Sequence, residues 1–518
     1  MCGCSEGSLA VGKSARRRTS KGIHGQCGHQ RMSFEQYDHA TSRRLIIDIG
    51  PLIIFDMLPD DVLIEMFDFY SDKDMGVESK DIKKRVEEWI TLAHVCRRWR
   101  IVVFQSPRRL NLRLICSPKT PAIYLDIWPP LPLIIHDSVG DFSPWSGTSG
   151  VGNIIAALNH NDHVSQIQLI KPSSSDLEYV TNSAPMQKPF PELTNLRLNA
   201  NRCHGPTLSD SFLSGTAPRL RSLTLFGITY PGLRKLLLSA THLVDLDLSY
   251  IPPSGYIPPE VMATSLATLT SLEYLRLRFI YPRPSRRPPP PPPTRSILPS
   301  LTKIIFKGGC EYLEGILARI DAPRLSHLHI EFFNQIIFDT PQLFQFIRRP
   351  TLRALEKGHV TFGYNRIFVK FPQSSDHGVH VEIRCKASEW QLSSLEQVCT
   401  SSLPPVSTLG DLYIFEDRKD PARWQDDVEN TLWLELLRPF ASVKNLYICK
   451  EFVPRIAPAL QELVGGRTTE VLATLENIFL EGFQPPEPQH EDIEKFVAAR
   501  QLTSHPIAVS PWDGVFKL

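Results

Sequence analysis

The residues with the clearest potential for chemistry are histidines and cysteines that lie close together in the chain. His327 and His329 are two residues apart, and Cys27 lies between His24 and His29. Imidazole nitrogens and thiolates are preferred zinc ligands, but a structural zinc site takes four of them. Neither group has further ligands at suitable spacing, so we expect no metal site.

Local motifs of catalysis or cofactor binding are absent from the sequence. It contains no GxSxG, HExxH, phosphate-loop or GxGxxG pattern. We interpret the glycine-rich residues 147–152 as a flexible loop, because no Gly-Lys-Ser/Thr follows them. The acid pairs Asp60-Asp61 and Asp426-Asp427 are interpreted as helix-start or surface residues. We therefore expect no cofactor and no enzyme activity.

Composition indicates a soluble protein of a reducing compartment. The 518 residues are 42% apolar and 22% charged, with a formal net charge of +2. This balance gives no electrostatic case for nucleic acid. No apolar run reaches the length of about 18 residues that a membrane helix needs, and the N-terminus has no apolar signal core. The ten cysteines form no CxxC pair, so we expect a cytoplasmic and/or nuclear location.

From about residue 160 the sequence repeats a unit with three apolar positions. Two residues separate the first from the second, and one separates the second from the third. Successive units up to Leu325 begin 23 to 29 residues apart, with short helical patterns between them. This period predicts an α/β leucine-rich-repeat solenoid, a horseshoe with strands inside and helices outside. The units begin at Val164, Leu193, Leu220, Leu243, Leu272, Leu301, Leu325, Leu409, Val443 and Leu475.

Two stretches interrupt this period. Strand-like runs at 360–371 and 379–384 predict degenerate repeat units between Leu325 and Leu409. A Pro- and Arg-rich insertion at 282–295 contains six consecutive prolines, Pro288 to Pro293, which must adopt polyproline II. Two interpretations of it are open: an exposed loop between repeats, or a ligand for an SH3, WW or profilin-like partner.

Residues 58–105 predict two helices before the repeats. Pro59 and the acids after it favour a helix start. Apolar residues then recur at helical spacing, and a second helix is predicted over residues 89–100. One face of this helix would carry Trp89, Leu92, Ala93, Cys96 and Trp99.

The segments LPDDVLIEMF (58–67) and WITLAHVCRRWR (89–100) resemble the two halves of an F-box. With the repeats, the chain resembles fungal F-box proteins that carry leucine-rich repeats. The resemblance implies a substrate-recognition subunit of a Skp–cullin–F-box ubiquitin ligase. Its helices would dock onto a Skp-type adaptor of the cullin complex, and its repeats would hold a protein substrate. The residues that match the family's adaptor-binding segments are Leu58, Pro59, Val62, Leu63, Phe67, Ile90, Leu92, Val95, Cys96, Arg97 and Trp99.

The expected organisation is a disordered tail (1–44), an F-box-like helical module (45–115), a linker or capping region (116–160), the repeat array (161–485) and a C-terminal cap or tail (486–518). Three alternatives stay open. The helices could only shield the first repeat, the chain could be a stand-alone repeat scaffold without a ligase, or an enzyme site could assemble from distant residues.

Side chains between the apolar strand positions point away from the core, because strand side chains alternate. In a horseshoe they line the concave face. Tyrosine and arginine are enriched at binding hot spots, so Tyr274, Arg276 and Arg278 are predicted to contribute to a substrate patch. The full predicted substrate-binding set is Arg197, Asp247, Tyr274, Arg276, Arg278, His329, Tyr413 and Tyr447.

Overall fold

The computed structural model describes residues 58–71, 91–106 and most of the chain between residues 112 and 514. The longest gaps in that last stretch are 138–147 and 282–293. Several sequence predictions lie outside the described residues: the disordered tail, the group around Cys27, Ile90, Asp426-Asp427 and the proline run. Residues 60–518 form one compact unit.

A 16-stranded sheet forms the core of this unit. All ten predicted repeat strands are present in chain order through the sheet, with one interruption between the seventh and the eighth. Neighbouring repeats pair in parallel with equivalent leucines in register, as in Leu196↔Leu223 and Leu223↔Leu246. The ten strands are β3 (Val164–Leu169), β4 (Asn195–Asn199), β5 (Ser222–Phe226), β6 (Asp245–Ile251), β7 (Tyr274–Phe279), β9 (Lys303–Gly308), β11 (His327–Phe332), β15 (Asp411–Glu416), β16 (Asn445–Ile448) and β17 (Asn477–Glu481).

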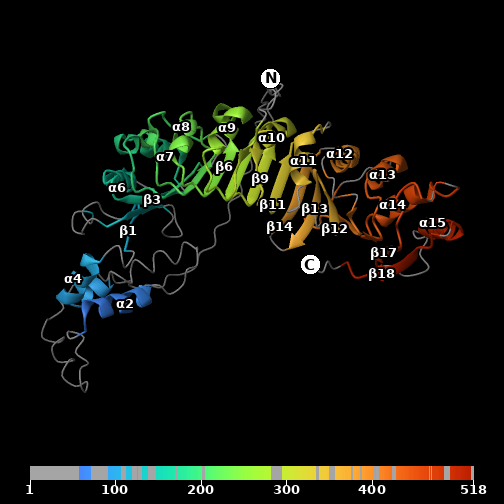
Figure 1. Ribbon diagram of the computed structural model, residues 1–518, viewed down its shortest axis with the longest axis horizontal. Coiled ribbons are helices and arrows are strands. Elements are labelled where there is room, and N and C mark those ends of the chain that lie inside the picture. The colour runs from blue at the N-terminus through green and yellow to red at the C-terminus, as the bar shows by residue number, and fades with distance from the viewer. Residues whose placement is uncertain are drawn as a thin grey trace, which may run out of the picture. The chain divides into compact units, whose positions relative to one another are not determined.

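Helices cover one face of the sheet, as predicted for leucine-rich repeats (Figure 1). The middle and last apolar residues of each unit point toward them, and Leu196, Leu223 and Leu246 are completely buried there. The helices are α6 (Thr148–Leu158), α7 (Ser174–Thr181), α8 (Leu233–Ser239), α9 (Pro259–Leu266), α10 (Cys310–Leu317), α11 (Pro341–Ile347), α12 (Ser388–Ser401), α13 (Asn430–Leu437), α14 (Val453–Gln461) and α15 (Glu491–Leu502), with 3-10 turns η2 (Ala184–Gln187), η3 (Phe212–Gly215) and η4 (Pro253–Gly255).

Helix α6 corrects the prediction of a flexible loop at residues 147–152. Thr148 to Gly152 belong to its first turns. Ile154, Ala157 and Leu158, at helical spacing, are completely buried. Burial of this apolar face stabilises the helix, and the helix therefore includes the glycines that precede it.

The sheet extends beyond the predicted array at both ends. Strands β1 (Leu114–Cys116) and β2 (Leu133–His136) pair in parallel with each other and then with β3. They lie mostly in the residues assigned to a linker or cap. At the other end, β18 (Ala508–Trp512) pairs in parallel with β17. Strands β2 and β18 cover the open edges of the terminal repeats, as the ends of a solenoid require.

The middle of the sheet corrects the prediction of degenerate parallel repeats. Strands β12 (Lys357–Gly363), β13 (Arg366–Ser374) and β14 (His377–Arg384) form an antiparallel meander, in the order β11-β14-β13-β12-β15. Only Tyr364 and Asn365 join β12 to β13. A connection this short can join antiparallel strands only, whereas a parallel pair needs a crossover of a dozen or more residues. The small pair β8 (Ser296–Ile297) and β10 (Ile320–Asp321) forms a separate sheet.

The N-terminal module contains helix α2 (Asp60–Ser71), a helical segment at 91–95 and helix α4 (Arg97–Gln105). The predicted continuous helix over 89–100 is wrong, because Cys96 is extended (φ −154°, ψ 172°) and separates the two segments. Its Sγ accepts a hydrogen bond from the Trp99 backbone N–H at 3.4 Å. Cys96 thus caps a new helix, as side-chain acceptors at this position commonly do.

No helix in the described ranges combines the length and apolar character needed to span a membrane. The six cysteines that the structure describes there carry free thiols.

Candidate binding face

The sheet face opposite α6–α15, here called the helix-free face, carries the polar and aromatic side chains of the strands. Strand β7 shows the alternation: Leu275 and Leu277 are buried, whereas Tyr274, Arg276 and Arg278 are half-buried. Strand register aligns equivalent positions of successive strands into a continuous row. The row runs Arg197, Thr224, Asp247, Arg276, Ile305, His329, His380, Lys370, His359, Tyr413, Tyr447, Phe479 and Ser510.

In the N-terminal part of the row, the predicted patch residues bind one another. Arg276 Nη1 lies 2.9 Å from Asp247 Oδ2, and the Arg276 guanidinium lies 5.3 Å from the centre of the Tyr274 ring. The charges of this pair are largely matched within the face. Arg197, by contrast, is exposed on β4.

A buried carboxylate organises the centre of the face. The side chain of Glu331 on β11 is 4% exposed and forms ion pairs with Lys307 Nζ (2.6 Å), Arg384 Nε (2.5 Å) and Arg278 Nη2 (3.6 Å). These cations come from β9, β14 and β7. One carboxylate therefore connects four strands, including the meander, through charge.

Three histidines lie beside this cluster. His329 and His380 are register partners with ring centres 4.1 Å apart, and His359 lies 5.0 Å from the ring of Tyr413. Burial lowers the pKa of His329 and of His359 to about 4, and that of His380 to about 2. All three imidazoles are therefore neutral at pH 7.

We expect these histidines to make the fold sensitive to acid. A folded pKa of about 4 for His359, lowered mainly by burial and then by Lys370 and Lys357, lies below the usual 6.5. Its contribution is complete above pH 6.5 and is lost as pH falls toward 4. Between pH 7 and pH 5 the fold should lose about 2 kcal/mol through this residue, measured by urea denaturation at both pH values.

The comparison variant is His359→Asn, which should show a smaller loss between pH 7 and pH 5 than the unmodified chain. The comparison is needed because Glu314 acts in the opposite direction. Burial raises the pKa of Glu314 to about 7, although its carboxylate accepts hydrogen bonds from the backbone N–H groups of Gln342 and Leu343. The contribution of Glu314 to the free energy of unfolding therefore rises as pH falls below 7. Equal pH dependence in the variant and the unmodified chain would contradict the prediction.

The C-terminal part of the row is aromatic. Tyr413, Tyr447 and Phe479 stack nearly parallel, with ring centres 4.1 and 4.4 Å apart, and Trp512 packs edge-on against Tyr447 at 5.5 Å. Beside this stack, the Asn445 amide donates to Asp411 (2.7 Å) and the Asn477 amide donates to Asn445 (2.8 Å). Tyr413 is only 7% exposed, so the accessible part of the stack is formed by half-buried Tyr447, Phe479 and Trp512. Amphipathic aromatic surface of this kind is characteristic of protein-binding sites.

The helical module presents two apolar surfaces. Leu63 and Phe67 on α2, together with Leu92, are buried inside it, and the Phe67 ring packs 4.8 Å from that of Trp99. These members of the predicted adaptor-binding set therefore hold the module together in this structure. A second stripe on α2, with residues at i, i+4 and i+7, is exposed: Val62 (37%), Met66 (42%) and Phe69 (75%).

The remaining members of that set have varied surroundings. Pro59, Val95 and Arg97 are exposed, and Leu58, Cys96 and Trp99 are half-buried. Arg98, outside the set, forms an ion pair with Asp60 at 2.7 Å that connects α4 to the start of α2. Val95 (57%) and Ile101 (44%) add further exposed apolar surface.

All eight predicted substrate-binding residues lie on strands of the helix-free face. Several of them contact other side chains of the same face. Asp247 pairs with Arg276, Tyr413 stacks on Tyr447, and Arg278 joins the Glu331 cluster. The sequence reasoning missed further residues of this face: Lys307, Glu331, His359, His380, Glu382, Arg384 and Trp512. Lys307 and Glu331 follow the same alternation and could have been found from it. His359, His380, Glu382 and Arg384 lie in the meander, where the repeat period gave no register.

Comparisons with known proteins identify no family for this chain. No protein-family model matches it, and no curated protein matches it. Among solved structures, the chain is similar to the leucine-rich repeat-containing protein LegL7 from Legionella pneumophila, with 11% identity over 74% of this chain and 97% of that one. The TM-score of 0.26 is too low to carry an argument. The leucine-rich-repeat character therefore rests on the strand register and the helix-covered face described above.

Proposed function

We propose that this chain is a non-enzymatic protein-binding scaffold whose helix-free face holds a partner protein. The observation that carries the proposal is the continuous row of mostly polar and aromatic side chains on that face. Repeat proteins use such extended surfaces for binding, and stacked aromatic residues beside arginines provide hot-spot chemistry. The partner would be a folded protein or an extended segment that spans several strands.

We further propose that the scaffold is the substrate receptor of a Skp–cullin–F-box type ubiquitin ligase. Two observations support this attachment. The segments at 58–67 and 89–100 resemble an F-box, and α2 exposes the stripe of Val62, Met66 and Phe69 in addition to its buried face. An exposed apolar helix stripe is suited to docking into the groove of another protein.

The docking stripe can be tested without unfolding the module. We expect the double variant Met66→Lys/Phe69→Lys to lose capture of a Skp-type adaptor from a lysate, because both side chains are exposed and charge prevents their burial in an interface. Circular dichroism should be unchanged. The matched control is Asp68→Lys, which adds a lysine to α2 away from the stripe and should retain capture.

A different outcome selects the alternative. If neither the unmodified chain nor the double variant recovers the adaptor, the chain is a stand-alone scaffold with a helical cap. If both recover it equally, the adaptor does not dock on the stripe of Val62, Met66 and Phe69. Capture by a chain lacking residues 45–110 then identifies proteins held by the repeats alone. Among these, partners lost in Tyr274→Ala/Arg276→Ala bind the helix-free face. That pair is preferred to a triple variant with Arg278, because Arg278 also pairs with buried Glu331.

A further inference from the structure

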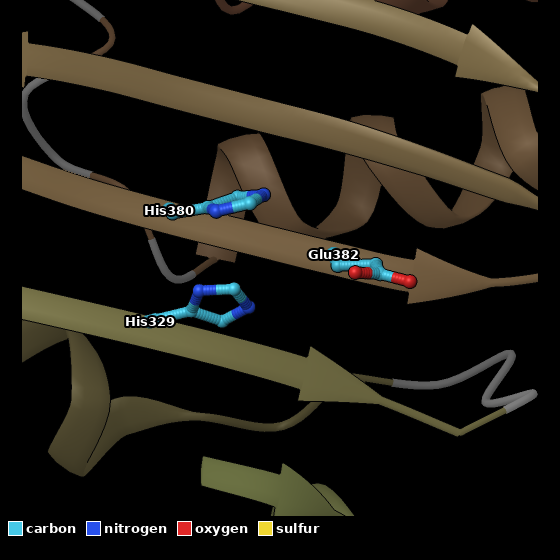
Figure 2. A group of neighbouring side chains, drawn as sticks. All are labelled: His329, His380 and Glu382. Atoms are coloured by element: carbon cyan, nitrogen blue, oxygen red, sulfur yellow. The ribbon is translucent and has the colours of Figure 1, made fainter. Parts of the chain in front are cut away.

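The centre of the helix-free face brings together three potential metal ligands from two strands. His329 on β11 and His380 on β14 are register partners, and Glu382 follows two residues after His380 on the same side of β14. Their ligand atoms, one from each residue, all lie within 4.8 Å of one another. Figure 2 shows the two imidazoles and the carboxylate gathered on one face of the neighbouring strands.

One polar atom of His380 and one of Glu382 lack a hydrogen bond. His380 Nε2 and Glu382 Oε1 are buried, and neither has a hydrogen-bond partner in the described part of the chain. Glu382 is 7% exposed. Buried polar atoms are nearly always partnered, and a bound ion can satisfy them where protein groups do not.

The neighbouring cations pair more closely with Glu331 than with Glu382. Arg278, Lys307 and Arg384 pair with Glu331, at distances up to 3.6 Å. Arg384 Nε also forms a longer ion pair with Glu382 Oε1 at 3.6 Å, a distance beyond hydrogen-bonding range. A cation between the two histidines and Glu382 would also relieve repulsion between Glu382 and its register partner Glu331.

We propose that His329, His380 and Glu382 form a binding site for a divalent transition-metal ion such as Zn²⁺. Two imidazoles and one carboxylate are a ligand set for zinc and for iron(II), whereas Mg²⁺ and Ca²⁺ prefer oxygen ligands alone. In a tetrahedral zinc site, ligand atoms lie about 3.4 Å apart. The ligand atoms now lie at most 4.8 Å apart. Side-chain rotations that bring them closer by a little over 1 Å would reach the tetrahedral spacing.

The electrostatic surroundings set the expected strength of the site. Burial keeps both imidazoles neutral at pH 7, so their lone pairs are available to a metal. Lys370, the register partner of His380 on β13, opposes a cation. We therefore expect weaker binding than in a closed four-ligand zinc site. Three protein ligands leave a coordination position for water or for a donor atom of a bound protein.

The test is a zinc titration of the full-length chain, freed of metal and kept reduced, in competition with a chromophoric chelator. Cobalt(II) serves as a second probe, since its visible absorption reports coordination geometry. We expect His380→Ala and Glu382→Gln to weaken the affected zinc equivalent by at least about tenfold and to remove its cobalt bands. His327→Ala, on the same strand face but outside the ligand set, should bind like the unmodified chain.

Two further variants keep the test decisive. Glu382→Gln preserves side-chain volume and decides the matter if His380→Ala fails to fold by circular dichroism. Cys449→Ser tests a second group, Cys449, Glu451 and Glu481, whose ligand atoms also lie within 4.8 Å of one another. The proposal is overturned if Glu382→Gln and His380→Ala bind zinc and cobalt like the unmodified chain, or if only Cys449→Ser removes binding.

Discussion

Replacing Glu331 with glutamine is expected to lower the free energy of unfolding by about 3 kcal/mol. The substitution preserves volume and removes one negative charge, so the effect is electrostatic. Lys307, Arg384 and Arg278 would remain at the centre of the sheet without their shared carboxylate, which lies 2.6, 2.5 and 3.6 Å from them. Removing one partner from a buried ion cluster costs more than the cluster contributes, because the remaining charges stay partly desolvated.

Urea denaturation followed by circular dichroism measures this effect, and the matched control is Glu476→Gln. Glu476 also pairs with a lysine, Lys444 at 3.2 Å, but both side chains are more than half exposed. Exposed pairs contribute little, so the control should lose less than about 1 kcal/mol. Faster amide hydrogen exchange in β9, β11 and β14 should accompany the loss in Glu331→Gln. Equal losses in the two variants would show that the cluster is effectively solvated.

The large expected effect of Glu331 on the free energy of unfolding follows from its position in the sheet. The meander of β12, β13 and β14 breaks the repeat pattern between two runs of regular units. Parallel repeats stack because each buries its apolar edge against the same edge of the next repeat. The antiparallel strands of the meander do not repeat this edge. Arg384 on β14 reaches Glu331 on β11 across this junction. The cluster therefore stabilises the junction between the first regular part of the array and the meander.

The sequence predicted the regular part of the fold well, and the reason is physical. Leucine recurs at the middle position of successive units, as at Leu223, Leu246 and Leu275. These side chains can all be buried only if the strands stack in register. The prediction made from this period was wrong between Leu325 and Leu409. There, antiparallel pairing depends on the two-residue turn at Tyr364 and Asn365, a local feature that carries no information about period.

The sequence predicted which residues lie on the helix-free face, but it could not predict the contacts among them. Alternation alone placed Arg276 and Tyr413 on the correct face of their strands. It could not show that Arg276 pairs with Asp247, because a pairing between strands depends on register. The grouping of His329 with His380 required the meander, which inserts β14 beside β11 although 50 residues of chain separate the two histidines. Metal ligands sought by spacing along the chain, such as His327 with His329, could not reveal it.

The helical module illustrates the same limit. Helical spacing grouped Val62, Leu63, Met66 and Phe67 as apolar residues of one helix. Only packing against α4 separates them into a buried pair, Leu63 and Phe67, and an exposed pair, Val62 and Met66. Mutations at the buried pair would therefore test the stability of the module, whereas mutations on the exposed stripe test docking.

At the C-terminal end, Arg500→Met is expected to lower the free energy of unfolding by about 3 kcal/mol. Arg500 on α15 is completely buried. Its Nη2 donates to the backbone carbonyls of Leu472, Ala473 and Leu475 at 3.3 to 3.4 Å. Methionine fills similar volume but leaves those carbonyls without this donor. The turn is also strained, since Leu472 has a φ of 52°, a conformation that costs a non-glycine residue roughly 1–2 kcal/mol.

Arg438→Met is the matched control for this position, because Arg438 is 59% exposed and pairs with Glu470 at 3.3 Å. It should change urea denaturation only slightly. In Arg500→Met, amide exchange should accelerate first in the turn at 471–475 and in β17, since the arginine connects that turn to the last helix. Repeat arrays lose structure from poorly capped ends, so loss of this one side chain should loosen β17 and β18 before the centre of the sheet. Uniform loosening of all strands would contradict the assignment of Arg500 as the residue that secures the C-terminal cap.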